Sequence, residues 1–117
     1  PAAAAVRGLV EQAIAGEAPL QLSEINLGEV IYHTERRHGI RQAQTTLVEI
    51  EALPNRFLTA NRRRILDAAH LKANHRLSYA DAFAAALAQE FGATLVTGDP
   101  EFRALEQLFA IAWLPQK

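Results

Sequence analysis

The chain has 117 residues, of which half are hydrophobic and 21% are charged, and its formal net charge is −1. This size and composition fit a globular protein with one modest core and exclude a disordered chain. The absence of cysteine excludes disulfides, thiolate zinc sites and thiol nucleophiles, and the small net charge provides no global field that attracts nucleic acid. The apolar runs are too short to span a bilayer and we find no secretion signal, so we expect a cytoplasmic protein.

The first half of the chain predicts helices separated by short strands. Apolar residues at helical spacing predict a helix over residues 2–15. A short extended segment over residues 19–22 predicts a strand, and a second helix is expected to begin at Asn26 and to end near Gly39. A third helix is expected over residues 40–53, where Pro54 stops it, and residues 57–59 predict a short strand.

The second half continues the alternation of helices and strands. Residues 61–73 predict a helix with Ile65, Ala69 and Leu71 as core contacts, and residues 78–91 predict a strong helix that ends at Gly92. A buried strand over 94–97, a short helix through Leu105 and a final strand over 109–113 complete the pattern. The predicted fold class is therefore α/β, with a parallel sheet flanked by helices in a single domain over residues 1–117.

Three acidic residues, Glu29, Asp81 and Asp99, stand at predicted helix starts. Each has an ordinary structural explanation. Glu29 and Asp81 occupy the third helical position of capping-box patterns that begin at Asn26 and Ser78. Asp99 precedes a proline, as an N-cap residue often does. Taken one at a time, these acids are more simply explained as helix caps than as catalytic residues.

Taken together, the three acids favour a metal site. In an open parallel sheet the helices start beyond the carboxyl edge of the strands, so first-turn side chains from separate units can converge in one crevice. Two unit charges about 4 Å apart repel by about 4 kcal/mol at an effective dielectric constant of 20. A divalent cation relieves that repulsion, and a set of carboxylate ligands favours Mg²⁺ or Mn²⁺ over zinc. Such a crevice suits metal-assisted phosphodiester hydrolysis.

Three segments of the chain carry a family resemblance. They are Leu22–Tyr32, Leu77–Ala88 and Ala93–Phe102, and each surrounds one of the three acids. In this order they resemble the second, third and fourth conserved blocks of the PIN-domain ribonucleases of the VapC toxin type. The likeness extends from about Ala2 to Leu114, and its strength lies in three blocks that follow one another at compatible spacing.

The resemblance implies a PIN-like three-layer α/β/α fold and an endoribonuclease that hydrolyses RNA phosphodiester bonds. It implies a toxin of a type II toxin–antitoxin pair, which uses Mg²⁺ or Mn²⁺ and is held inactive by a cognate antitoxin. Carried over by position, Glu29, Asp81 and Asp99 would be the catalytic, metal-binding acids. Thr97 would orient the last acid or a water molecule, and Glu101 would be an outer acid.

The chain departs from the family pattern at its beginning. The pattern starts with a central strand that ends in a metal-binding aspartate, and nothing before Pro1 supplies that strand. We therefore expect the first strand to be missing and the neighbouring strand edges to lack a partner. A processed product, a strand from another chain and a rearranged fold remain open as explanations. The alternative function is a catalytically inactive PIN-like module that retains partner binding, and a nuclease acting on DNA is a third.

Three further features have two interpretations each. The basic clusters at residues 36–41 and 62–64 are interpreted as solvated helix ends rather than as RNA contacts, because no aromatic residues alternate with them. Trp113 is interpreted as a core residue or an interface anchor. The apolar faces of the second and third helices are explained by ordinary burial or by a homodimer or antitoxin interface.

Overall fold

The structure is a computed structural model that describes residues 20–53, 55–97 and 99–113. The helix predicted over residues 2–15 lies outside this range. Within the described part of the chain, no helix is long and apolar enough to cross a membrane. The elements in chain order are β1 (Leu20–Ser23), α2 (Glu24–His38), α3 (Ile40–Ala52), β2 (Asn55–Leu58), α4 (Arg62–Asn74), α5 (Tyr79–Phe91), β3 (Leu95–Thr97), the 3-10 helix η1 (Pro100–Leu105) and β4 (Ile111–Trp113).

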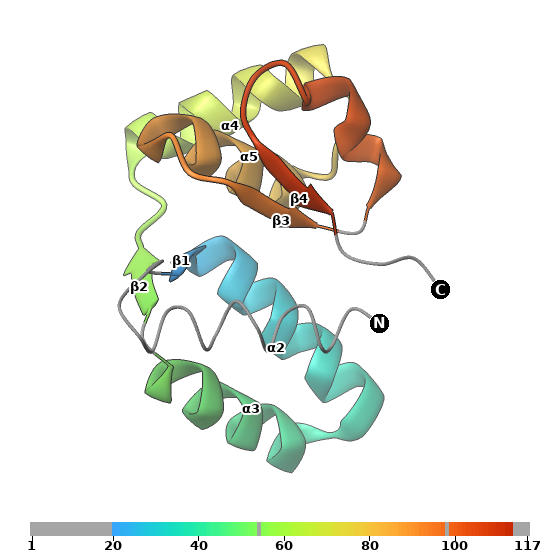
Figure 1. The fold of residues 1–117 in the computed structure, drawn as a ribbon. Helices are drawn as coiled ribbons and strands as arrows, with labels where there is room; N and C mark the ends of the chain where they lie inside the picture. The colour runs from blue at the N-terminus through green and yellow to red at the C-terminus, as the bar shows by residue number, and fades with distance from the viewer. Residues whose placement is uncertain (1–19, 54, 98, 114–117) are drawn as a thin grey trace.

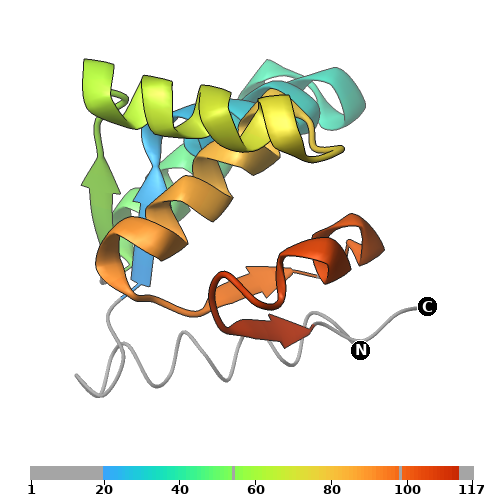
Figure 2. The ribbon, with the colours of Figure 1, turned by 90° about the horizontal axis from the view of Figure 1, so that it is seen from above.

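Short parallel strands flanked by helices make this an α/β fold, as predicted (Figure 1). The described strands form two separate parallel pairs rather than one continuous sheet. β1 pairs with β2, in a register that places Ser23 beside Leu58, and β3 pairs with β4, in a register that places Thr97 beside Trp113. Helix α5 contacts both β1 and β3, so this one helix connects the two pairs (Figure 2).

The hydrophobic core lies around α5. This helix carries six buried residues, and buried side chains from α4, η1 and the following turn complete the cluster. Its aromatic and leucine members are Leu71, Leu77, Phe83, Phe102, Leu105 and Phe109. Apolar residues of β3 and β4, namely Leu95 and Ile111, pack against the same cluster. The start of α5 is therefore held by a well-packed core, which fixes the position of the side chains in its first turn.

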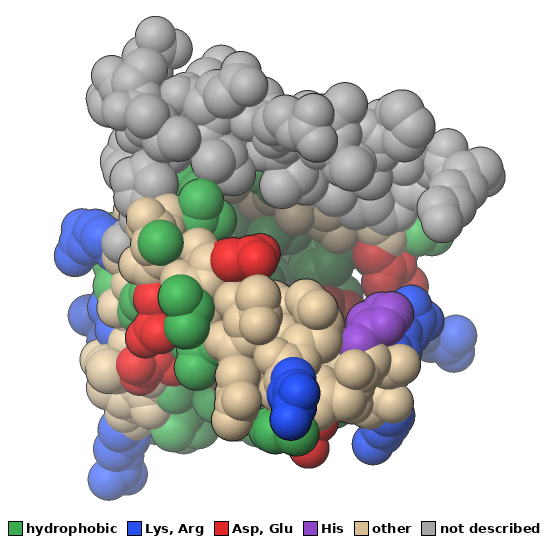
Figure 3. Space-filling model, turned by 90° about the horizontal axis from the view of Figure 1, so that it is seen from below, with side chains coloured by type: hydrophobic (Ala, Val, Ile, Leu, Met, Phe, Trp, Pro, Cys, Tyr) green, Lys and Arg blue, Asp and Glu red, His purple; other side chains and the backbone are tan. Residues whose placement is uncertain are grey.

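The hairpin of α2 and α3 is packed less tightly. These two helices contact mainly each other; α2 has no buried residue, and the only buried residue of α3 is Ala43. Large apolar side chains on this hairpin remain open to solvent: Val30, Tyr32, Ile40 and Val48. Seen from the α3 side, hydrophobic and charged side chains are mixed on the surface (Figure 3). The predicted apolar faces themselves are half-buried, for example at Leu27, Ile31 and Leu47, so burial accounts for them in part.

The second helix begins earlier than the capping pattern predicts. Ser23 is its N-cap, and the Ser23 hydroxyl accepts a hydrogen bond from the Ile25 backbone N–H at 3.2 Å. The predicted start at Asn26 is therefore wrong, and so is the capping box that placed Glu29 at the third helical position. The Asn26 side chain instead donates a hydrogen bond to the Ala80 carbonyl at 2.8 Å, which ties α2 to the start of α5.

The predicted core face of α4 is also partly wrong. Leu71 is buried as expected, but Ile65 and Ala69 are exposed and Ala68 is buried in their place. The buried face is the one that packs on α5, where Ala68 and Leu71 join the core. On the same side Arg64 forms a two-pronged ion pair with Glu90 of α5, both contacts at 3.0 Å. The strand predicted over residues 57–59 begins two residues earlier, at Asn55, and ends one residue earlier, at Leu58, opposite Ser23.

Candidate metal centre

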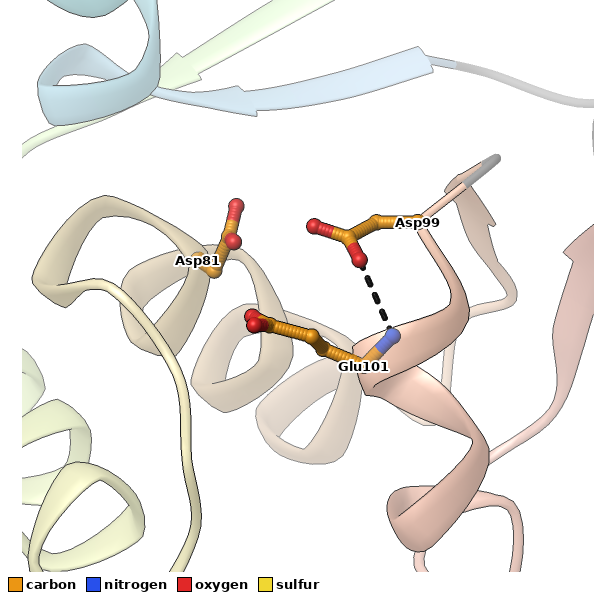
Figure 4. Close-up of side chains that lie close together, drawn as sticks. All are labelled: Asp81, Asp99 and Glu101. Atoms are coloured by element: carbon orange, nitrogen blue, oxygen red, sulfur yellow. Dashed lines mark hydrogen bonds between the residues drawn. The ribbon is translucent and has the colours of Figure 1, made fainter.

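Three carboxylates converge at the starts of α5 and η1. One oxygen each from Asp81, Asp99 and Glu101 lies within 4.8 Å of the other two (Figure 4). Asp81 comes from the first turn of α5, Asp99 follows β3, and Glu101 lies in the first turn of η1. Residues 18 to 20 positions apart in the sequence are brought together because α5 and η1 start at the same edge of the fold.

Asp81 is held by the cap of α5. The Ser78 hydroxyl accepts a hydrogen bond from the Asp81 backbone N–H at 3.1 Å, as the capping pattern at Ser78 predicts. Partial burial raises the pKa of the Asp81 carboxyl, the Ser78 hydrogen bond lowers it, and the nearby charge of Asp99 raises it; the net shift is upward. Folding therefore disfavours the ionised form of Asp81, and a cation beside it would stabilise that form.

Asp99 is the N-cap of η1, as its position before Pro100 predicts. Its Oδ1 atom accepts a hydrogen bond from the Glu101 backbone N–H at 2.9 Å (Figure 4). The Asp99 backbone N–H in turn donates to the Thr97 hydroxyl at 3.1 Å. The first bond fixes the Asp99 side chain and the second fixes its backbone, while the second carboxylate oxygen stays available for a further ligand.

Glu101 joins the group from the exposed side of η1 (Figure 4). Its backbone N–H binds Asp99, while its carboxylate extends toward Asp81 and Asp99. The resemblance assigned Glu101 only an outer role, because spacing alone does not show how far a glutamate reaches from a turn. The closeness of Asp99 and Glu101 in the sequence is the one signal that points to their meeting.

Glu29 is not a member of this group among the described residues. It is half-buried on α2, one helical turn after Asn26. Because residues three apart lie on one side of a helix, Glu29 shares the side of α2 that Asn26 attaches to Ala80, the residue before Asp81. The structure thus brings two of the three predicted acids together, adds Glu101, and places Glu29 on the side of α2 that Asn26 fastens to α5. The Asn26 contact carried no sequence signal beyond the wrongly assigned cap.

The donor set of this group fits a hard divalent cation. All three side chains offer carboxylate oxygens, and no histidine or cysteine belongs to the cluster in the described residues. Oxygen-only ligands suit Mg²⁺ and Mn²⁺, which also retain several water molecules and so need few protein ligands. Exposure on the Glu101 side leaves room for a phosphate-bearing substrate to approach.

The chain belongs to the PIN domain family, whose sequence pattern matches residues 1–108. The matched region includes all three carboxylates of the group as well as Glu29 and Thr97. PIN domains are typically nucleases that use divalent metals, so the family suggests a nuclease-type function for this chain. No curated protein gives a significant match to it.

Proposed function

We propose that the protein is a metal-dependent endoribonuclease of the VapC type that hydrolyses RNA phosphodiester bonds. One observation carries the proposal: in a chain of the PIN family, the carboxylates of Asp81, Asp99 and Glu101 converge within 4.8 Å. Mg²⁺ or Mn²⁺ is the proposed cofactor, since these ions prefer oxygen ligands. Asp81, Asp99 and Glu29 are the proposed catalytic and metal-binding acids, with Thr97 and Glu101 in support.

A divalent cation in this group supplies a Lewis acid that activates water and stabilises negative charge on the phosphate. The residues of the chain make that chemistry possible by their placement. Ser78 and the core around α5 hold Asp81, and Thr97 holds the backbone of Asp99. The raised pKa of Asp81 disfavours its charged form, which a bound cation would stabilise.

Glu29 is proposed to complete the site from the opposite side. The hydrogen bond from Asn26 to Ala80 fixes this part of α2 against the start of α5, and Glu29 follows one turn later. From this part of α2 a glutamate side chain would reach toward the acidic group, and this reach is the part of the proposal that Glu29→Gln tests. Replacing Asn26 should therefore weaken activity through Glu29, without changing the two aspartates.

Cleavage of RNA by the full-length protein tests this proposal. We expect Mn²⁺-dependent cleavage of a structured RNA, and a loss of more than about 100-fold in the variants Asp81→Asn and Asp99→Asn, because even changes to residues behind metal ligands cost about 10- to 100-fold. Glu49→Gln is the matched control, because it removes one exposed charge from α3, far along the chain from the group. Absence of cleavage, or full activity of Asp81→Asn, would reject the nuclease.

The exposed apolar residues of α2 and α3 favour a second role for the same chain, that of a partner-binding module without catalysis. Val48 is 65% exposed and Ile40 is 55% exposed, so both side chains are accessible to a partner. As the toxin of a type II toxin–antitoxin pair in the cytoplasm, the protein would use this hairpin to bind its antitoxin or a second copy of itself.

Val48→Asp separates these two roles. The substitution places a charge in the exposed apolar region of α3 and should abolish partner binding or dimer formation in sedimentation analysis. RNA cleavage by the free protein should be retained, because the substitution lies outside the acidic group. Loss of partner binding in a protein that never cleaves RNA would favour the inactive module.

A further inference from the structure

The only tryptophan of the chain is paired with an arginine close to the acidic group. The Arg103 guanidinium carbon lies 5.7 Å from the centre of the Trp113 ring, which is the distance of a cation–π contact. Trp113 is nevertheless 39% exposed, so the interpretation of this residue as part of the core is wrong. Among the described residues, Arg103 forms no salt bridge that neutralises its charge.

The connections of the chain place this pair at the same edge as the carboxylates. Trp113 ends β4 and is the register partner of Thr97, which ends β3. Paired residues on neighbouring strands project from the same face of a sheet, so Trp113 and Thr97 share a face. The Thr97 hydroxyl binds the backbone of Asp99, and Arg103 lies on η1, the helix that Asp99 caps.

An acidic group that cleaves RNA needs a cation nearby, because the carboxylates repel the phosphates of the substrate. Arg103 supplies one positive charge two residues after Glu101, on the same short helix. An exposed tryptophan beside it supplies the flat surface on which an unpaired base stacks, and arginine and aromatic side chains commonly act together in this way.

The basic clusters on α2 and α4 also place an arginine over an aromatic ring, Tyr32 on α2 and Phe91 on α5. Arg36 of the first pair lies in the last turn of α2, and Phe91 ends α5, the helix that carries Asp81 in its first turn. Both pairs therefore lie at helix ends away from the acidic group.

We infer that Arg103 and Trp113 form a subsite for one nucleotide of single-stranded RNA at the rim of the acidic group. Trp113 stacks on an unpaired base, and Arg103 neutralises the adjoining phosphate. This inference rests on the proposed ribonuclease function and deepens it, since it names the part of the substrate that is held. It also specifies that the substrate is unpaired at this position, because a base within a duplex cannot stack on a side chain.

Fluorescence of the single tryptophan tests the subsite directly, without cleavage. Full-length protein is titrated in EDTA with a six-nucleotide single-stranded RNA and, separately, with a blunt RNA duplex. We expect the single strand to quench Trp113 and the duplex to leave it unchanged. Binding of a labelled single strand, followed by anisotropy, should weaken about 5- to 100-fold in Trp113→Leu, which is the range that one base–aromatic stack contributes.

Arg103→Gln should weaken the same binding and reduce the slope of log affinity against log salt concentration by about 0.7, the value for one phosphate contact on a single strand. Arg62→Gln, a change at the exposed start of α4, is the matched control and should leave affinity and slope unaltered. In RNA cleavage, Trp113→Leu should raise KM and preserve kcat, whereas a role confined to fastening β4 to η1 would lower the melting temperature and leave KM unchanged.

The outcomes separate this inference from the proposed function. Quenching by single-stranded RNA in a protein that does not cleave in Mn²⁺ supports the subsite and rejects the nuclease. Cleavage with no quenching, with unchanged KM in Trp113→Leu, overturns the subsite and leaves the nuclease in place. Equal quenching by the single strand and the duplex also overturns it, because the duplex offers no free base along its length.

Discussion

Replacing Asp81 by asparagine is expected to stabilise the metal-free protein and to remove its response to divalent cations. The substitution keeps the shape of the side chain and deletes one of three charges that lie within 4.8 Å of one another. Two unit charges at that separation repel by about 0.9 kcal/mol in water and about 3.5 kcal/mol at an effective dielectric constant of 20. Since the group is partly exposed, we expect the free energy of unfolding to rise by about 1 kcal/mol, which raises the melting temperature by about 4 °C.

Mn²⁺ should stabilise the wild-type protein more than it stabilises Asp81→Asn. At ten times its dissociation constant, a ligand that binds only the folded protein stabilises it by about 1.4 kcal/mol, which corresponds to about 5 °C here. The wild-type protein should therefore melt lower than Asp81→Asn in EDTA and gain several degrees in Mn²⁺, whereas the variant should gain little. Differential scanning fluorimetry in EDTA and across an Mn²⁺ titration measures both values. Glu49→Gln changes net charge by the same amount and should behave like the wild type.

The effect also depends on pH, with a sign that follows from the raised pKa of Asp81. An acid whose pKa is raised on folding costs stability once it ionises, so metal-free wild type should lose stability relative to Asp81→Asn as pH rises above the ordinary value of 3.8. Below that value both forms are neutral at this position and the difference should vanish. A variant that melts lower than wild type in EDTA at pH 7, together with an unaltered Mn²⁺ response, would refute the reasoning.

Three further predictions concern the scaffold. Asn26→Ala removes the bond to the Ala80 carbonyl and should cost about 0.5–1.5 kcal/mol in urea unfolding; an unchanged midpoint would contradict the attachment of α2 to α5. Glu90→Gln should lower the melting temperature at pH 7, because Arg64 lowers the pKa of Glu90, and the difference should disappear as pH falls below 4.5; a constant difference would show that the charge is irrelevant. Gly39→Ala should cost about 1–3 kcal/mol in the same unfolding assay, since Gly39 has φ of 90° and ψ of 170°, and no loss would show that this turn rearranges freely.

Local chemistry made the caps predictable. Ser78 and Asp99 start their helices as their side chains indicate, and Gly92 ends α5 in the left-handed conformation with φ of 58°. In each case the deciding interactions lie within a few residues of one another, so these helix ends can be predicted from the local sequence alone. The α/β class followed in the same way from the alternation of helical and strand-like segments.

Long-range contacts account for the errors. Asn26 has the residue type of a cap, yet its amide binds a carbonyl 54 positions away, and Ser23 serves as the cap instead. On α4, the buried face is the one that packs on α5, and on that side Arg64 pairs with Glu90, 26 positions away. Trp113 was interpreted as a core residue or an interface anchor, and its exposure excludes the first of these. None of these outcomes follows from spacing or propensity, because each depends on a partner from a different element.

The three clustered carboxylates all come from residues 81–101, downstream of the α2–α3 hairpin. A molecule that binds the exposed side of the hairpin therefore contacts neither of the helices that carry those oxygens. A protein bound to the hairpin would then inhibit either by covering the approach to the three carboxylates or by shifting Glu29, and not by separating the carboxylates from one another. An inhibitor that only covers the approach would leave Mn²⁺ affinity intact and abolish cleavage, whereas one that shifts the proposed ligand Glu29 would also weaken Mn²⁺ binding. Isothermal titration of the complex distinguishes the two.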